Sequence, residues 1–275
     1  MIRENLNITK EFINNLNYPD FVSFINQWNV LPGSFVTINK WAKFSNINEN
    51  SNILQIACTT GFQSREIAIL TGCKGKAFDL SHMAVEMAKY NKKVYAPNIT
   101  IDYFQADGML YETSEKFSHV LIGAGIQFFP NPQKALNKSV SFLKDNGYLL
   151  ASPYYAIDEL PKEIIAKGKE VFGINVTSKS YKEIIGMYET LEVMYEDRNT
   201  IPVETEGELK KYCENTIDRA CIIHNISDQE IYETMYKRLL LVRQTSNLLR
   251  QYLNYSVLVL RYRKNTYPNR YVELF

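Results

Sequence analysis

The amino-acid sequence predicts an α/β fold: a doubly wound, mostly parallel sheet with helices on both faces. Two observations support this prediction. Apolar runs of strand length alternate with segments of helical pattern from Ile53 to Ser152, and parallel strands need crossover helices of this kind. The chain has 275 residues, of which 45% are hydrophobic, so it can bury one large core and carry a subsidiary element.

A helical cap is expected ahead of the sheet, over residues 1–50. Apolar residues recur at helical spacing between Asn7 and Phe44, and Pro32-Gly33 divides them into two segments. The polar stretch Ser45–Ser51 connects the cap to the first strand. We expect the cap either to cover the edge of the sheet or to act as a lid over a ligand.

The segment Asn52–Ser64, NILQIACTTGFQS, has the pattern of a strand, a tight loop and a helix. Backbone N–H groups of such a loop and of the first helical turn converge on one point, where a nucleotide-like or carboxylate-bearing ligand can accept hydrogen bonds. A β-branched residue is disfavoured at positive φ. We therefore expect Gly61 to adopt the left-handed conformation and Thr59 a conventional one.

The alternation continues after this helix. A second strand, Lys74–Phe78, ends at Asp79, a helix follows from an N-cap at Ser81 to about Tyr90, and a third strand spans Ile99–Phe104. A carboxylate at the carboxyl end of a neighbouring parallel strand is well placed to bind the two hydroxyl groups of a ribose.

Two further strands are expected at Phe117–Ile122 and Tyr148–Ser152. Between them, Asn131-Pro132 starts a helix and Asn146-Gly147 ends it. The loops that follow all five strands lie at one edge of the sheet, which is where ligands bind in open α/β folds.

The second half of the chain is more helical. Two helices, a strand and a last strand buried on both faces are expected at Leu160–Phe172, Tyr181–Tyr188, Leu191–Tyr195 and Ser256–Arg261. Residues 204–253 form a helical insertion, in which the capping box Ser227-Asp228-Gln229-Glu230 opens a long helix. The core then comprises residues 51–203 and 254–275. The insertion is expected either to roof a substrate pocket or to serve as a packing element or dimer interface.

Composition excludes several classes of function. The formal net charge of +1 gives no reason to expect a nucleic-acid partner. The four cysteines form no CxxC pair, so we expect reduced thiols and no metal site. The first residues, MIRENLNITKEF, lack the apolar core of a signal peptide, and no stretch has membrane-spanning length. We expect a soluble, cytoplasmic protein without a membrane partner.

Five stretches in this order resemble the class I S-adenosylmethionine-dependent methyltransferases: ILQIACTTGF, AFDLS, FQADGML, FSHVLIGAG and LKDNGYLLAS. The resemblance covers Pro32–Ser152 well and the remainder loosely. It implies a Rossmann-like sheet of seven strands and S-adenosylmethionine as the cofactor. The family's first loop usually shows an acidic residue and three glycines, whereas Gln55, Ala57 and Thr59 hold three of those places here and only Gly61 keeps its glycine.

The resemblance also implies where the cofactor binds. Asp79 is expected on the ribose, and Asp107 near the adenine amino group, although Asp107 can equally cap the turn that follows it. The cofactor-binding residues expected in full are Ala57, Cys58, Thr59, Gly61, Asp79, Leu80, Ala106, Asp107, Gly108 and Gly123.

Methyl transfer requires an acceptor in line with the S–methyl bond and disperses a positive charge, so positioning and desolvation dominate. A general base is optional and depends on the acceptor atom. We expect His224 as the candidate base and structural roles for His82 and His119. The expected substrate-binding residues are Gln127, Phe128, Tyr154, Tyr155 and Tyr212.

The leading hypothesis is therefore an S-adenosylmethionine-dependent methyltransferase acting on a small molecule, as a monomer or a homodimer. A catalytically silent relative that serves as a partner or sensor is the alternative, suggested by the altered loop. Asp79 and Asp107 argue against it, because a decayed site has no need of them. An NAD(P)-dependent oxidoreductase ranks lower, since its fingerprint requires three glycines where this loop has one.

Overall fold

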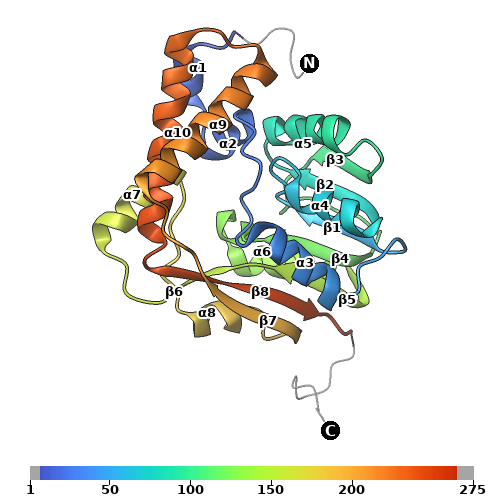
Figure 1. The fold of residues 1–275 in the computed structure, drawn as a ribbon. Helices are drawn as coiled ribbons and strands as arrows, with labels where there is room; N and C mark the ends of the chain where they lie inside the picture. Colours follow the sequence, from blue (N-terminus) through green and yellow to red (C-terminus); the bar gives the residue numbers. More distant parts are fainter. Residues whose placement is uncertain (1–6, 265–275) are drawn as a thin grey trace.

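The computed structural model describes residues 7–264. Within this range the chain forms an eight-stranded sheet with helices on both faces (Figure 1). The strand order is β3-β2-β1-β4-β5-β8-β6, and β7 pairs with β8 as well. The first five of these strands are parallel, whereas β8 runs antiparallel to β5, β6 and β7. The predicted doubly wound α/β fold is confirmed.

The strands are β1 (Asn52–Ile56), β2 (Lys74–Asp79), β3 (Thr100–Gln105), β4 (Phe117–Gly123), β5 (Leu143–Ala151), β6 (Tyr154–Ala156), β7 (Glu192–Thr200) and β8 (Leu253–Arg261). The helices are α1 (Lys10–Asn15), α2 (Tyr18–Phe24), α3 (Ser34–Phe44), α4 (Phe62–Thr71), α5 (His82–Tyr95), the 3-10 helix η1 (Gly125–Phe128), α6 (Pro132–Ser141), α7 (Lys162–Phe172), α8 (Tyr181–Gly186), α9 (Glu206–His224) and α10 (Gln229–Leu249).

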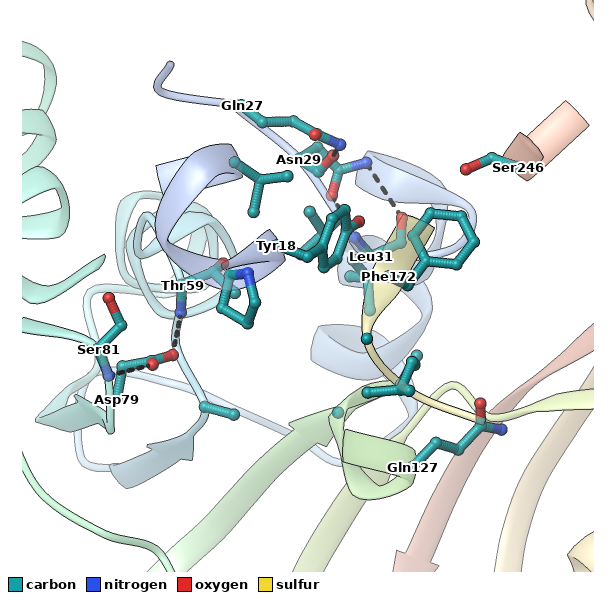
Figure 2. Close-up of a pocket in the computed structure, with 18 of the residues that line it drawn as sticks. Tyr18, Gln27, Asn29, Leu31, Thr59, Asp79, Ser81, Gln127, Phe172 and Ser246 are labelled. Carbon is teal, nitrogen blue, oxygen red and sulfur yellow. Dashed lines mark hydrogen bonds between the residues drawn. The ribbon is translucent and has the colours of Figure 1, made fainter. Parts of the chain in front are cut away.

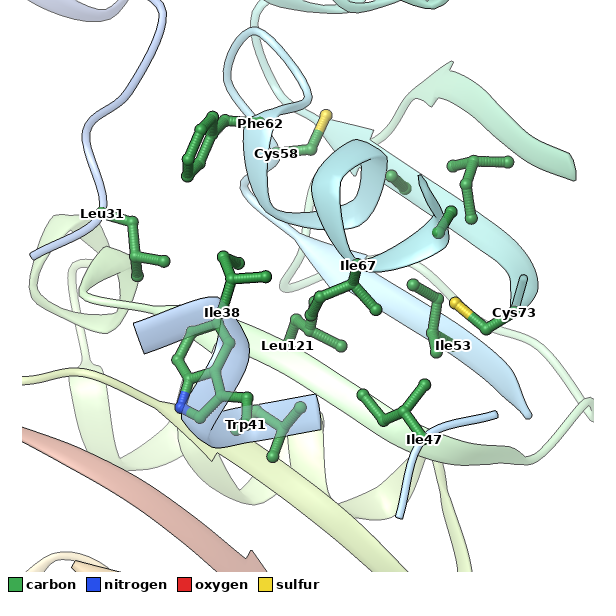
Figure 3. Packing of buried hydrophobic residues seen from close by; sticks show 14 of the residues in the cluster. Leu31, Ile38, Trp41, Ile47, Ile53, Cys58, Phe62, Ile67, Cys73 and Leu121 are labelled. Carbon is green, nitrogen blue, oxygen red and sulfur yellow. The ribbon is translucent and has the colours of Figure 1, made fainter. Parts of the chain in front are cut away.

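Two apolar layers hold the sheet between its helices. On one face, Ile38 and Trp41 of α3 and Ile67 of α4 pack against Ile53 and Leu121 of β1 and β4 (Figure 3). On the other face, η1, α6 and α8 cover the alternate side chains of the same strands. Strand β1 is buried on both faces, which explains its nearly continuous apolar run.

Three expectations about the elements need correction. The sheet has one strand more than the predicted seven, because Tyr154–Ala156 pairs with β8 where a loop was expected. The amino-terminal segment forms three helices, because Asn17 caps a separate helix, α2, with Pro19 in its first turn. Helix α6 ends at Ser141, not at Asn146-Gly147, because the buried Leu143 already pairs with Phe117 and the asparagine turns inside β5 with a φ of 61°.

The remaining helices gather beside the sheet, and we call α1, α2, α7, α9 and α10 the helical layer (Figure 1). Buried side chains of α1, α2, α9 and α10 form one cluster, and α7 packs on α10 in a second. Asn225, in the left-handed conformation, ends α9. Asp228 caps α10 in place of Ser227 of the expected capping box, because its side chain accepts from the N–H groups of Glu230 and Ile231, and the two helices form a hairpin. Helix α3 instead packs on the sheet side, against α4 and β8.

Candidate functional site

A cavity of about 1600 Å³ lies between the carboxyl ends of the parallel strands and the helical layer. Figure 2 shows that its walls come from both sides, with Asp79 and Thr59 on one and Ser246 of α10 on the other. We call the part formed by the loops after β1, β2 and β3 the strand-end half. The part formed by α9 and α10 is the helical half.

The loop after β1 is bent by three left-handed residues: φ is 54° at Ala57, 47° at Thr59 and 80° at Gly61. The expectation for Gly61 is confirmed, and the expectation of a conventional Thr59 is wrong. The reason is a tertiary contact, because the N–H of Thr59 donates to the Asp79 carboxylate at 2.9 Å. Gly61 has no room for a side chain, since a Cβ would lie 2.9 Å from the Tyr103 ring.

Asp79 ends β2 at the wall of the cavity and is only 8% exposed. One carboxylate oxygen accepts from the Thr59 N–H and the other from the Ser81 N–H, each at 2.9 Å (Figure 2). Burial raises the pKa of Asp79, and these two backbone hydrogen bonds oppose the rise. The Ser81 hydroxyl in turn donates to Asp20, which brings the start of α2 onto this half of the cavity.

The loop after β3 places Ala106, Asp107 and Gly108 on the same wall. Asp107 accepts a hydrogen bond from the Met109 N–H at 2.7 Å, and its carbonyl accepts from Tyr111. Asp107 therefore caps the turn that follows it, as the local interpretation predicts, while its side chain remains at the cavity wall.

The structure brings most of the expected site residues together. Those that line the cavity are Ala57, Thr59, Asp79, Leu80, Ala106, Asp107, Gly108, Gln127, Tyr154 and Tyr212. Four others do not line it: Cys58, Gly61, Gly123 and Tyr155. Cys58 lies in the core beneath α4, where burial raises the pKa of its thiol, and Tyr155 packs edge-on against Tyr181. The side chain of Phe128 lies outside the described part of the structure.

The candidate base His224 does not line the cavity either. Tyr212, Thr216 and Arg219 follow one another at helical spacing on the cavity face of α9, and His224 comes off this stripe. Its ring stacks on Phe24, with ring centroids 4.1 Å apart, and its Nε2 lies 2.7 Å from the Phe24 carbonyl. His224 therefore packs against α2 and does not face the cavity.

The other two histidines differ from each other. His82 starts α5 at the cavity wall. His119 is buried in β4, where its Nε2 lies 3.0 Å from the Ser45 carbonyl, and burial lowers its pKa to about 4. His119 thus has the expected structural role, because it ties the end of α3 to the sheet.

Two glutamines at the cavity wall were not expected. Gln27 and Gln63 are each 6% exposed, and the Oε1 atom of each has no hydrogen-bond partner among the described residues. Gln63 sits in the first turn of α4, and Gln27 is held nearby because the Thr60 hydroxyl donates to its carbonyl at 3.1 Å. Buried acceptors normally have a donor, so these oxygens point to a ligand that carries N–H groups. The sequence could have indicated Gln63, because it follows Gly61 in the first turn of the helix after the binding loop, whereas no local pattern marks Gln27.

Comparison with known proteins identifies the family. A family model described as "Methyltransferase domain" matches residues 47–238. No curated protein sequence matches the chain at a significant level. Among the described residues, no helix has both the length and the apolar character needed to cross a membrane.

Three similar structures illustrate the fold. The crystal structure of MccD protein has a TM-score of 0.70 and 26% identity, covering 86% of this chain and 100% of that one. A methyltransferase from Geobacter sulfurreducens, solved with S-adenosylhomocysteine, has a TM-score of 0.67 and 15% identity, with 90% and 100% covered. Haemonchus contortus phosphoethanolamine N-methyltransferase 2, solved with phosphomonomethylethanolamine and S-adenosylhomocysteine, has a TM-score of 0.65 and 15% identity, with 94% and 61% covered.

The matched region runs from just before β1 into α10 and so contains the whole strand-end half of the cavity. S-adenosylmethionine is the cofactor of this family. The order of the strands, the carboxylate at the end of β2 and the family match agree with one another. The chain belongs to the class I S-adenosylmethionine-dependent methyltransferases.

Proposed function

We propose that the protein transfers the methyl group of S-adenosylmethionine to a small-molecule acceptor by in-line displacement. The observation that carries this proposal is the single cavity of about 1600 Å³ that joins the strand-end half to the helical half. Ligand pockets are typically about 300–1,000 Å³, so this one has room for a nucleoside-sized cofactor and a small acceptor in one shared space.

The residues of the strand-end half fit the cofactor. We assign the Asp79 carboxylate to the ribose hydroxyl groups and Asp107 to the adenine side. The unpartnered oxygens of Gln27 and Gln63 can accept from the amino group of the methionine part. Ala57 and Thr59 line the first loop. Their small side chains let a ligand approach the backbone there.

When bound, S-adenosylmethionine supplies a methyl group on a positively charged sulfur. The task of the chain is then to hold an acceptor in line and to exclude water. Gln127, Tyr154 and Tyr212 form part of the wall around the acceptor space, and the Gln127 amide donates to the Tyr154 carbonyl at 3.3 Å. Burial raises the pKa of Tyr154 to about 12, so its phenol stays protonated. This environment suits an amine or carboxylate acceptor, which needs no general base.

The helices supply the cover in this proposal. Residues 204–253 roof the acceptor space, and the cap over residues 1–50 contributes α2 as a lid on the cofactor. The core comprises residues 51–203 and 254–275; residues 1–6 of the cap and 265–275 of the core lie outside the described part of the chain. Tyr18 and Asp20 of α2 line the cavity, and the Ser81 hydroxyl donates to Asp20 just after the end of β2, which supports the lid. A cytoplasmic protein working as a monomer or homodimer, without a nucleic-acid partner, completes the proposal.

Calorimetric titration with S-adenosylhomocysteine tests the cofactor assignment. Asp79→Ala should weaken binding by about 1.5 to 3 kcal/mol, or about tenfold or more, because a charged hydrogen-bond acceptor is lost. Asp102→Ala is the matched control, since Asp102 is an exposed carboxylate on β3 that does not line the cavity, and its affinity should stay within about twofold. Equal affinities for wild type and Asp79→Ala would contradict the ribose assignment. Wild type that fails to bind would contradict the proposed function.

A further inference from the structure

Charge is unevenly distributed over the cavity. The acidic residues of the strand-end half are Asp79 and Asp107, and Asp20 of α2 lies beside them, where it accepts from the Ser81 hydroxyl. The helical half is lined instead by Arg219 of α9, by Arg238 and Arg243 of α10 and by Arg250 at the C-cap of α10, with Glu204 just ahead of α9. One further carboxylate, Glu170 of α7, is exposed and lies 3.5 Å from Lys167. Four guanidinium groups therefore face a single sheltered carboxylate.

Arg243 and Arg250 share that carboxylate. Arg243 is in α10 and Arg250 is its C-cap residue about two turns later, with Ser246 between them on the cavity wall. Arg243 Nη2 contacts both oxygens of Glu204, at 2.7 and 2.5 Å, and Arg250 Nη1 lies 2.6 Å from one of the same oxygens. The exposed fraction of the side chain is 14% for Arg243 and 15% for Arg250. One negative charge cannot neutralise two guanidinium groups held this close.

Arg219 and Arg238 add positive charge without a carboxylate. Arg219 donates to the Asn26 carbonyl at 2.9 Å, and Arg238 donates to the carbonyls of Ile13 and Leu16. Within the described residues neither of them forms an ion pair. The Nε atoms of Arg219 and Arg243 are buried and have no hydrogen-bond partner among residues 7–264.

A sheltered charge is costly unless it is paired, and a guanidinium has five N–H donors, which match the oxygens of a phosphate or carboxylate. Towards residues 7–264, Arg243 uses only its Nη2 group among these donors, so it retains capacity for a ligand. The distribution of charge thus indicates that a negatively charged ligand group completes the helical half.

We propose that the methyl acceptor carries an anionic group, a phosphate or a carboxylate, that binds Arg243 and Arg250 with support from Arg219. The proposal rests on the proposed function, because it places the acceptor in the helical half beside the cofactor. The anchored end then lies on α10, and the end that receives the methyl group extends towards Gln127 and Tyr154. Specificity would come from the charge at one end, while the reaction takes place at the other.

Titration of the full chain, saturated with S-adenosylhomocysteine, tests this proposal. Inorganic phosphate and succinate are the two probes, and ligand-observed NMR measures their binding. We expect one of them to bind wild type with a dissociation constant on the order of 1 mM. Arg243→Gln should weaken that binding at least about tenfold, and Arg243→Lys less, because lysine keeps the charge and loses the planar fork.

Lys237→Gln is the matched control, because Lys237 lies on the same helix and its side chain is 75% exposed. It should change anion binding less than about twofold. If Arg243→Gln does not fold, Arg250→Gln replaces it, since Glu204 then keeps its contacts with Arg243. A preference for phosphate or for succinate would identify the source of the charge.

Two results would overturn the proposal: binding of neither probe to wild type, or equal weakening by Arg243→Gln and Lys237→Gln. The arginines would then serve only to tie α10 to Glu204 and to the end of α1, and α9 to the Asn26 carbonyl. Both results leave the affinity for S-adenosylhomocysteine intact. If wild type did not bind S-adenosylhomocysteine at all, that result would instead contradict the proposed function.

Discussion

The two halves of the cavity are built in different ways. The strand-end half consists of short loops and buried backbone groups, and Asp79 organises it by holding the N–H groups of Thr59 and Ser81. The helical half consists of long side chains on α9 and α10 whose partners come from segments far away in the sequence, such as Asn26 for Arg219. The first half depends on the topology of a parallel sheet, and the second depends on how separate helices pack. Mutations should therefore affect the two halves separately.

Replacing Gly61 should break the strand-end half most severely. Gly61→Val places a β-branched side chain at a φ of 80° and against Tyr103 and Ala88. We expect the free energy of unfolding to fall by about 3–5 kcal/mol, from backbone strain and overpacking together, and cofactor binding to be lost. Urea unfolding and calorimetry measure the two effects. Gly207→Val, at a helical position with nothing within 4 Å, should change stability by less than about 1 kcal/mol.

His119, buried in β4 of the sheet, should make the free energy of unfolding depend on pH. Its pKa is lowered to about 4 by burial, so the unfolded chain binds the proton first as the pH falls. Stability from this group is complete above pH 6.5 and is lost as the pH falls towards 4, by up to about 3 kcal/mol. Urea unfolding at pH 7.5 and 4.5 should show this loss shrinking in His119→Gln. His82 is exposed, so His82→Gln should show the same loss of stability between pH 7.5 and 4.5 as wild type.

The helical layer can be weakened without touching the cofactor. Arg238 donates to two carbonyls at the end of α1, and its guanidinium lies 4.3 Å from the Phe21 ring centroid. Arg238→Ala should lower the free energy of unfolding by about 2 kcal/mol and leave the affinity for S-adenosylhomocysteine within about twofold. Lys237→Ala is the control. A large loss of cofactor affinity in Arg238→Ala would show that the halves are not separate.

The smallest effect is expected at Thr59. Thr59→Gly removes the strain of a threonine at a φ of 47°, and this gain exceeds the added entropy of the unfolded chain. We expect stability to rise by about 1 kcal/mol with cofactor binding retained. Thr200→Gly, at the end of β7 where the backbone is not left-handed, should lower stability instead. If the free energy of unfolding fell equally in Thr59→Gly and Thr200→Gly, the backbone of Thr59 would not be strained.

Much of the strand-end half could be predicted from the sequence. The rule that loops at the carboxyl ends of parallel strands meet at one edge placed Asp79, Asp107 and Ala57 correctly at the cavity wall. Local chemistry was also informative, since Ser81 caps α5 as expected. Thr59 shows the limit, because the hydrogen bond that its N–H donates to Asp79 at the end of β2 outweighs its local conformational preference.

The helical half could not be predicted in the same way. Apolar spacing predicted α9 and α10, but it does not say which polar stripe faces a cavity. The chemistry of His224 suggests a base, but its ring lies against Phe24. Nothing in the sequence marks Arg219 or Arg243, because an isolated arginine on a helix is usually solvated. Arg219 is held by the Asn26 carbonyl and Arg243 by Glu204, and no local pattern encodes these contacts between distant segments.

Hydrogen exchange of the full chain with S-adenosylhomocysteine tests the division of the site most directly. We predict protection in residues 57–64, 79–83 and 106–109 and in the amino-terminal segment 17–31, because α2 and the segment after it cover the cofactor. Residues 206–250 should change little until an anion is added. Protection concentrated in α9 and α10, with none at the strand ends, would contradict the account.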